Sequence, residues 1–166
     1  MTALDDIDRK ILALLQRDGR MTNAAIAAEV GLTAPSVFER VRKLEQRGVI
    51  RGYSALVDAA ALGKTLTALI RLTVQSDERH DRGIRAIAAD PDVLEMYNVA
   101  GEDCLVIKTK VATPSDLEAL IRRIRRHITV QRSVTMIALS TLKENSPVDV
   151  EVAGGAAKTT RVRSPN

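Results

Sequence analysis

Four cations are concentrated in a short segment that directly follows a glycine turn. The turn is Gly31-Leu32-Thr33, and the cations are Arg40, Arg42, Lys43 and Arg47. A small helix, a tight turn and a basic second helix are the parts of a helix-turn-helix, which places its second helix in the major groove of DNA. The segment 22–48 therefore predicts a unit that binds double-stranded DNA.

Helical periodicity divides the second helix of this segment into a core side and an exposed side. Val37, Val41 and Leu44 recur at helical spacing and are expected to face inward. Recognition helices contact base edges mainly near their N-terminus, so phosphate contacts are expected further along. The candidate base or groove contacts are Thr33, Pro35, Ser36, Phe38 and Glu39, with Thr22 at the start of the preceding helix; the candidate phosphate contacts are Arg42 and Lys43.

Arg40 has two roles that the sequence supports equally. It lies nearer the core side, where it either holds a phosphate or forms an internal salt bridge with an aspartate of the first helix. The alternative for the whole basic set is a solvated helix face, since Glu39 and Glu45 partly offset the cations. The Gly31 turn and the Thr33 cap favour DNA binding, as does the family resemblance described below.

A second candidate site is the turn Gly101-Glu102-Asp103. Backbone N–H groups exposed at a glycine turn can hold a carboxylate, and Glu102 or Asp103 can hold an ammonium group. This combination suits a free amino acid. The alternative is a plain hairpin turn, because Gly and Asp are common turn residues in any case.

The elements that must position these residues fall into two halves. Three helices are predicted first, ended by Gly19, Gly31 and Gly48 and followed by a short strand over residues 49–57. The second half predicts strands at 65–74, 93–100, 105–111 and 130–142, with one helix over 77–89 and another opened by Thr113-Pro114-Ser115-Asp116.

The order βαββαβ in the second half is the ferredoxin-like arrangement, an antiparallel four-stranded sheet with two helices on one face. Its other face is left uncovered, which predicts pairing with a second copy of the chain. The expected fold class is α+β. The expected domains are a DNA-binding domain over 1–63, a βαββαβ domain over 64–143 and a flexible basic tail over 144–166.

Composition excludes several other classes of protein. Aromatic residues make up 2% of the 166 residues, which disfavours single-stranded nucleic acid binding by base stacking. A single cysteine, Cys104, permits no intrachain disulfide, and no apolar run reaches the roughly 20 residues of a membrane span, so we expect a cytoplasmic protein. Cys104, His80 and His127 offer no metal-ligand spacing, and no catalytic motif is present, so no cofactor, metal or enzymatic activity is predicted.

Two runs of short motifs also occur in a characteristic order between residues 4 and 142. The N-terminal run comprises Leu4-Asp5-Asp6-Ile7-Asp8, Ile11-Leu12, Asp18-Gly19-Arg20, Gly31-Leu32-Thr33, Val37, Arg40-Val41, Leu44, Gly48-Val49-Ile50 and Gly52-Tyr53. The C-terminal run comprises Tyr97-Asn98-Val99-Ala100-Gly101-Glu102-Asp103-Cys104, Thr135 and Leu139. In order and spacing these motifs resemble the Lrp/AsnC family of prokaryotic transcription regulators.

The resemblance implies a winged-type helix-turn-helix joined to an effector-binding βαββαβ domain. It also implies dimers formed through the sheet, assembly of dimers into octamers, and amino acids as effectors. The effector residues it implies are Tyr97, Asn98, Val99, Ala100, Gly101, Glu102 and Asp103, with Thr135, Met136 and Ile137 as a wall supplied by a neighbouring chain. At Ala100, Cys104 and Leu105 the chain departs from residues common in the family, which argues against leucine or asparagine as the effector.

The expected function is therefore sequence-specific regulation of transcription under the control of a small molecule such as an amino acid. The alternative is an oligomeric amino-acid sensor without DNA activity of its own, and the basic helix argues against it. A further basic run, Arg122–Arg126, is expected to be a solvated helix end favoured by the helix dipole. A contact of this run with DNA or with a neighbouring subunit is the other interpretation.

Overall fold

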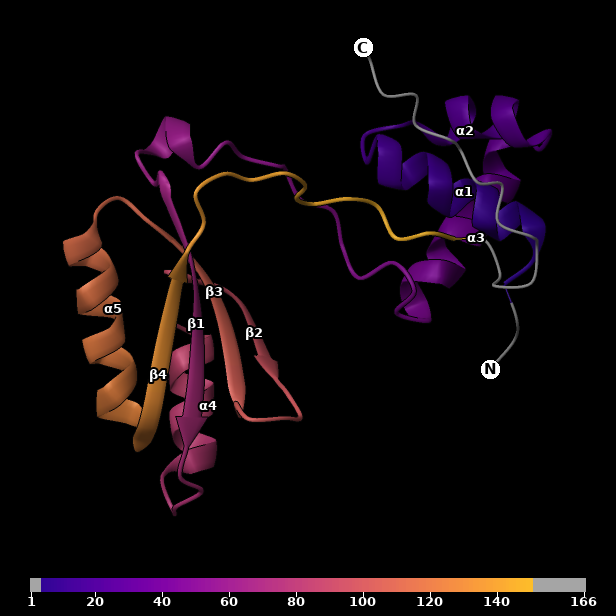
Figure 1. Cartoon of the computed structure of the whole chain (residues 1–166). Helices are drawn as coiled ribbons and strands as arrows, with labels where there is room; N and C mark the ends of the chain where they lie inside the picture. The colour runs from indigo at the N-terminus through magenta and orange to yellow at the C-terminus, as the bar shows by residue number, and fades with distance from the viewer. Residues whose placement is uncertain (1–3, 151–166) are drawn as a thin grey trace, which may run out of the picture. The chain divides into compact units, whose positions relative to one another are not determined.

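The computed structural model describes residues 4–150. The described chain forms two compact units, of which the first combines residues 4–55 with residues 143–150, and the second spans Leu56–Leu142 (Figure 1). The chain thus passes between the units twice, after Ala55 and again after Leu142. Among the described residues, no helix has both the length and the apolar character that crossing a membrane requires.

The first unit contains the three predicted helices α1 (Asp6–Arg17), α2 (Asn23–Val30) and α3 (Ala34–Gln46). Each helix begins at a residue whose side-chain oxygen accepts a hydrogen bond from a backbone N–H of the first turn. Asp5 caps α1, Thr22 caps α2 and Thr33 caps α3. Gly31 ends α2 in the left-handed conformation, with φ at 71°, which glycine adopts without steric cost. The sharp α2–α3 turn follows from this conformation.

Each of the three helices contributes at least one buried apolar side chain to the core of the first unit. Ile11 of α1, Ile26 of α2 and Val37 of α3 are fully buried, and Leu44 joins them. Fully burying a side chain of this size stabilises a fold by roughly 1.5–3 kcal/mol. The inward positions expected from helical spacing on α3 are therefore confirmed at Val37 and Leu44, while Val41 is half-buried.

The strand predicted over residues 49–57 is absent. This stretch carries no strand, and Leu56 and Val57 are largely exposed. A strand requires a hydrogen-bonded neighbour, and no other described segment of this chain pairs with these residues. The segment predicted as a strand therefore has no partner among the described residues of the single chain.

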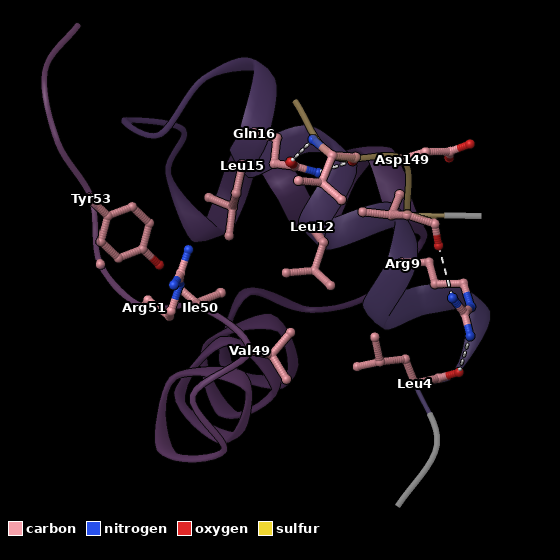
Figure 2. A pocket seen from close by; sticks show the side chains of 13 residues that line it. Leu4, Arg9, Leu12, Leu15, Gln16, Val49, Ile50, Arg51, Tyr53 and Asp149 are labelled. Carbon is pink, nitrogen blue, oxygen red and sulfur yellow. Dashed lines mark hydrogen bonds between the residues drawn. The ribbon is translucent and has the colours of Figure 1, made fainter. Parts of the chain in front are cut away.

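The segment predicted as a flexible tail also differs from expectation where it is described. Val148 and Val150 lie against α1 of the first unit and are held by side chains of Gln16 and Arg9 (Figure 2). Backbone-to-side-chain contacts of this kind cannot be read from helical or strand periodicity. The remainder of that prediction, residues 151–166, lies outside the described residues.

The second unit has the predicted βαββαβ order. Its elements are a short 3₁₀ turn η1 (Ala60–Leu62), β1 (Leu66–Val74), α4 (His80–Ala88), β2 (Val93–Asn98), β3 (Leu105–Val111), α5 (Pro114–His127) and β4 (Val130–Ile137). The strands form one antiparallel sheet in the order β2-β3-β1-β4, as the ferredoxin-like prediction requires. The last strand ends at Ile137 rather than at 142, because its register places Ile137 opposite Ala68 near the start of β1.

Both helices cover the same face of this sheet (Figure 1). Ile70 and Leu72 of β1 point into the core with Ile87 of α4 and Leu120 of α5. The two helices approach closely at Gly83, where a Cβ atom would lie 2.3 Å from the carbonyl oxygen of His127. A side chain at this position would therefore force the helices apart.

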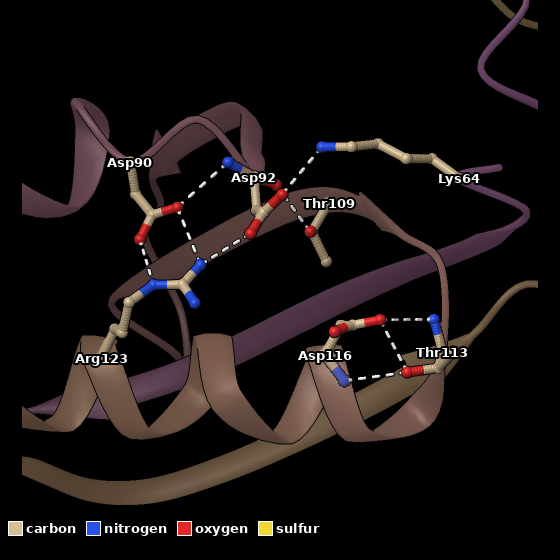
Figure 3. A network of polar contacts seen from close by, with 7 residues as sticks. All are labelled: Lys64, Asp90, Asp92, Thr109, Thr113, Asp116 and Arg123. Carbon is tan, nitrogen blue, oxygen red and sulfur yellow. Dashed lines mark hydrogen bonds and ion pairs between the residues drawn. The ribbon is translucent and has the colours of Figure 1, made fainter. Parts of the chain in front are cut away.

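A polar network joins α5 to the segments that precede β1 and β2. Arg123 of α5 donates from Nε to Asp90 at 2.6 Å and from Nη2 to Asp90 and Asp92 at 3.0 and 2.7 Å (Figure 3). Lys64 donates to Asp92 at 2.8 Å, and the buried Thr109 hydroxyl donates to the Asp92 carbonyl oxygen at 2.6 Å. Arg123 is therefore a structural residue, and the prediction that the whole 122–126 run is solvated is wrong at this position.

The carboxylates of this network are stabilised in their charged form. The hydrogen bond from Arg123 is the main cause that lowers the pKa of Asp90. The hydrogen bond from Lys64 is the main cause that lowers the pKa of Asp92, and Arg123 adds to it. The network thus joins the segment before β1, the α4–β2 turn and α5.

Candidate DNA-binding and effector sites

The exposed side of α3 carries the predicted DNA contacts. Pro35, Ser36, Phe38, Glu39, Arg42 and Lys43 are all exposed. Phe38 is 52% exposed although it is a large aromatic side chain without a polar atom. An exposed aromatic residue near the start of a candidate recognition helix is suited to apolar contact with a thymine methyl group.

The hydroxyl groups at the start of α3 are arranged by the helix cap. Thr33 Oγ1 accepts a hydrogen bond from the Ser36 backbone N–H at 3.4 Å, and the two hydroxyl oxygens lie 2.9 Å apart. Thr22 makes the equivalent cap on α2, accepting from the Ala25 N–H at 3.2 Å. These caps fix the positive ends of both helices, where backbone N–H groups favour an anion such as phosphate.

Arg40 takes the internal of its two predicted roles. Its Nη1 atom lies 2.7 Å from Asp5 and 2.8 Å from Asp8, and both carboxylates lie at the start of α1. The Asp8 side chain is only 12% exposed. The pKa of Asp5 is lowered first by the Asp8 backbone N–H and then by Arg40. Arg40 therefore joins α3 to α1 in this structure, which positions the recognition helix.

Arg42 and Lys43 remain on the solvent side of the same helix. Arg42 makes an ion pair with Glu39 at 3.8 Å, and both side chains are more than half exposed. Pairs of this kind contribute about 0–1 kcal/mol, so a phosphate can replace Glu39 at little cost. The two residues expected to contact phosphates are thus accessible.

The candidate effector turn connects β2 and β3. The Cys104 N–H donates to the Leu72 carbonyl oxygen at 2.8 Å, and the Val99 N–H donates to the Cys104 carbonyl oxygen at 3.0 Å. Gly101 has φ at 139°, a conformation that side chains rarely adopt. The turn is therefore held against β1, with Gly101 at its tip.

Asp103 is the buried acid of this turn. Its side chain is 8% exposed, and it accepts a hydrogen bond from Arg71 Nε at 2.6 Å on Oδ2, with Arg71 Nη2 also in contact. Its other oxygen, Oδ1, is buried and has no hydrogen bond. Arg132 of β4 approaches to 3.9 Å from that oxygen and 3.8 Å from Glu102. A buried carboxylate oxygen without a hydrogen bond is costly, and it is a ready acceptor for an ammonium group.

Not all predicted effector residues come together in one chain. The β1–β4 register places Met136 opposite Leu69, whereas Arg132 lies opposite Thr73, beside the turn. Thr135, Met136 and Ile137 therefore lie further along β4 than the turn does. They remain candidates for a wall of the effector site that a neighbouring chain would supply, as predicted from the sequence.

The prediction missed two residues of β1 that contact the turn. Arg71 binds Asp103, and the Thr73 hydroxyl donates to the Glu102 carbonyl oxygen at 3.2 Å. Their signal in the sequence is the alternation of polar residues with buried ones along β1. Tyr97, by contrast, is turned to its own strand, because its hydroxyl donates to Glu95, and this contact raises the pKa of Tyr97.

The face of the sheet opposite the helices presents apolar side chains to solvent. Leu69 is 37% exposed and Met136 is 41% exposed, and they are neighbours across β1 and β4. Lys108 and Glu95 form an ion pair at 3.0 Å on neighbouring strands. Within residues 4–150, no group of three or more His, Cys, Asp or Glu side chains is placed to hold a metal ion.

Comparison with known proteins identifies the family of each of the two domains. Residues 4–51 match the winged helix-turn-helix DNA-binding family, and residues 66–148 match the Lrp/AsnC ligand binding domain. The transcriptional regulator LrpA of Mycobacterium tuberculosis is 38% identical over 135 residues, covering 81% of this chain and 90% of the relative. The leucine-responsive regulatory protein of Rhizobium meliloti is 37% identical over 150 residues, covering 89% and 96% of the two chains.

Solved structures show the same fold. The crystal structure of Mycobacterium tuberculosis LrpA has a TM-score of 0.77 at 37% identity and covers 86% of this chain and 97% of that one. A transcriptional regulator from Neisseria meningitidis, solved as a complex with L-Met, has a TM-score of 0.82 at 24% identity over 88% of this chain and 96% of that one. This family consists of transcription regulators and not of enzymes. The chain belongs to the Lrp/AsnC family of transcriptional regulators, with a helix-turn-helix DNA-binding domain and a ligand-binding domain.

Proposed function

We propose that the chain binds operator DNA through the exposed side of α3. The base or groove contacts are Thr33, Pro35, Ser36, Phe38 and Glu39, with Thr22 of the α2 cap beside them, and the phosphate contacts are Arg42 and Lys43. The observation that supports this assignment is the exposure of Phe38, Arg42 and Lys43 on a helix whose other side is buried. Arg40 acts indirectly, by holding α3 on α1. We propose the cytoplasm as its place of action, because the single cysteine, Cys104, permits no intrachain disulfide.

Fluorescence anisotropy with DNA from upstream of the protein's own gene tests this assignment. Phe38→Ala is expected to reduce the ratio of specific to random-sequence affinity about 5- to 100-fold, since a base contact carries roughly 1–3 kcal/mol of discrimination. The matched control is Leu62→Ala, which removes an exposed apolar side chain from the second unit. An unchanged specificity ratio for Phe38→Ala would remove this residue from the interface.

The effector site is proposed at the Gly101 turn. Asp103 Oδ1 accepts the ammonium group of a free amino acid, and the backbone at Gly101 with Arg132 holds its carboxylate. The support is the buried Asp103 oxygen without a hydrogen bond, beside a guanidinium group that is 53% exposed. Tyr97–Ala100 frame the turn, and Thr135–Ile137 of a neighbouring chain close the site.

Isothermal calorimetry against a panel of amino acids tests the effector site. L-methionine is the first probe, because the regulator from Neisseria meningitidis was solved with it. Heat of binding that disappears in Asp103→Asn supports the site, whereas equal binding by wild type and Asp103→Asn places the effector elsewhere. No heat for any member of the panel would remove the amino-acid effector from the proposal.

A homodimer is the proposed minimal assembly, and dimers assemble further to an octamer. Leu69 and Met136 on the open sheet face support this, as do the exposed Leu56 and Val57, which pair with no other segment among residues 4–150. Light scattering is expected to give a multiple of 18.1 kDa that falls in Leu69→Glu but not in Arg85→Glu on the helical layer. A mass of 18.1 kDa for the wild-type protein would contradict the assembly.

A further inference from the structure

The described end of the chain returns to the DNA-binding unit in a defined conformation. After β4 ends at Ile137, the chain runs to Asn145, whose φ is 52°. Left-handed backbone at a residue other than glycine is uncommon, and asparagine tolerates it best. The chain turns there and then reaches α1 with residues 148–150, which we call the C-terminal strap.

Gln16 of α1 holds the strap at two points. Its Nε2 atom donates to the Val148 carbonyl oxygen at 2.9 Å, and its Oε1 atom accepts from the Val148 N–H at 2.7 Å. The Gln16 amide thus pairs with both the N–H and the C=O group of Val148, as a backbone amide of a neighbouring strand would in a sheet. The Val148 side chain is 76% exposed, so this residue is held through its backbone.

Arg9 holds the strap about two turns earlier on the same helix. It donates from Nη1 to the Val150 carbonyl oxygen at 2.8 Å and from Nη2 to the Leu4 carbonyl oxygen at 3.2 Å. The Val150 side chain packs against the core that contains Ile11 and Leu12. The strap is therefore held at Val150 by a charged guanidinium group and at Val148 by a neutral amide. Hydrogen bonds from a charged donor are stronger than neutral ones.

A groove of about 570 Å³ lies between the strap, which forms one wall, and the rest of the first unit (Figure 2). Its floor is α1, and its other wall is the segment after α3. The residues that line it are Leu4, Arg9, Leu12, Leu15, Gln16, residues 49–53 and the strap itself. The surface is thus an apolar floor with the Gln16 amide as donor and acceptor at one end and the Arg9 guanidinium as donor at the other, which suits an extended peptide.

We infer that the face of α1 that carries Arg9 and Gln16 is a docking surface for the chain's own C-terminal strap, and that the strap is a second link between the ligand-binding unit and the recognition helix. The link runs from β4 through the strap to α1, and from Asp5 and Asp8 of α1 to Arg40 of α3. The first link is the segment after α3. The regulatory part of this inference rests on the proposed effector control of DNA binding.

Hydrogen exchange in the full-length protein tests whether the strap is bound. In Gln16→Glu the acceptor for the Val148 N–H remains, but the donor is lost and a carboxylate oxygen faces the Val148 carbonyl oxygen. The Val148 amide is expected to exchange about 2- to 10-fold faster than in wild type, as loss of one net hydrogen bond implies. Lys10→Ala on the exposed side of α1 is the control and leaves this rate unchanged. Equal exchange rates in wild type and Gln16→Glu would overturn the inference.

Truncation tests the regulatory part. Removal of residues 148–166 deletes the strap, and removal of residues 151–166 is the matched control that keeps it. DNA affinity is measured with and without L-methionine, or with whichever amino acid of the panel binds the wild-type protein. The strap deletion is expected to reduce the effector-induced change in affinity at least about twofold, while the control retains it.

The two proposals fail differently in this experiment. If no amino acid changes the DNA affinity of the wild-type protein, effector control fails, and the strap is judged by the Val148 exchange rate alone. If the wild type responds and the strap deletion responds equally, the second link is contradicted although effector control stands. Thermal unfolding of both truncated proteins shows whether any loss arises from an unfolded DNA-binding unit.

Discussion

Two clusters of carboxylates face arginines in the second unit, and they differ in completeness. In the first, Arg123 meets both oxygens of Asp90 and one of Asp92, and Lys64 binds the other oxygen of Asp92. In the second, Asp103 has one oxygen bound by Arg71 and one without a hydrogen bond. A complete network stabilises a fold, whereas an incomplete one beside an exposed guanidinium group has capacity for a ligand. The comparison therefore separates a structural site from a binding site.

The largest expected effect is on stability at the complete network. Arg123→Ala leaves Asp90 without its main donor and Asp92 with Lys64 in place of two cationic donors, and we expect the free energy of unfolding to fall by about 2–3 kcal/mol. Urea unfolding of Arg122→Ala is the control, since this neighbour makes only an exposed pair with Glu118 at 4.0 Å. That control should change stability by less than about 0.5 kcal/mol. Equal losses of stability in both variants would contradict the structural role of the Arg123 network.

Asp103→Asn should produce the next effect, and chiefly on binding. The amide keeps the shape of the carboxylate but removes the charge that would hold an ammonium group. We expect the affinity for the effector to fall at least about tenfold, with stability changed far less than in Arg123→Ala. Calorimetry and urea unfolding of the same samples give both numbers. A loss of stability as large as that of Arg123→Ala would show that this cluster is structural as well.

The stability of the fold at acid pH should depend on the network of Arg123 with Asp90 and Asp92. The pKa values of Asp90 and Asp92 are lowered in the folded state, so these groups bind protons more readily when unfolded. Their contribution is present above the unfolded pKa of about 3.9 and is lost as pH falls through the lowered folded pKa. We expect the stability of the wild type to decline more steeply than that of Arg123→Ala between about pH 5 and the folded pKa. Parallel curves would contradict this assignment.

The helix ends and the strand order of the fold were predictable from the sequence. Helix ends followed from Thr22, Thr33 and the Thr113–Asp116 capping box, because caps are local chemistry. The sheet followed from alternation of apolar residues. The partner of Asp103 did not, since Arg71 is 32 residues away and only the strand register brings it there.

Other features depend on contacts that have no sequence period. The strap is held by Gln16, which is 132 residues from Val148 along the chain. Arg40 was left between two roles because its choice depends on where the start of α1 lies relative to α3. The strand expected at 49–57 failed for the opposite reason: its local pattern was suitable, but no described segment supplies a partner.

Salt dependence of DNA binding by the Arg42→Ala/Lys43→Ala double variant tests the central claim most directly. If both side chains contact phosphates, the slope of log affinity against log salt concentration should fall in magnitude by about two units, roughly one per contact. Arg122→Ala/Arg125→Ala removes the same charge from the second unit and should leave the slope unchanged. An unaltered slope in the α3 variant, or an equal loss in both, would contradict the assignment of α3 as the DNA-binding surface.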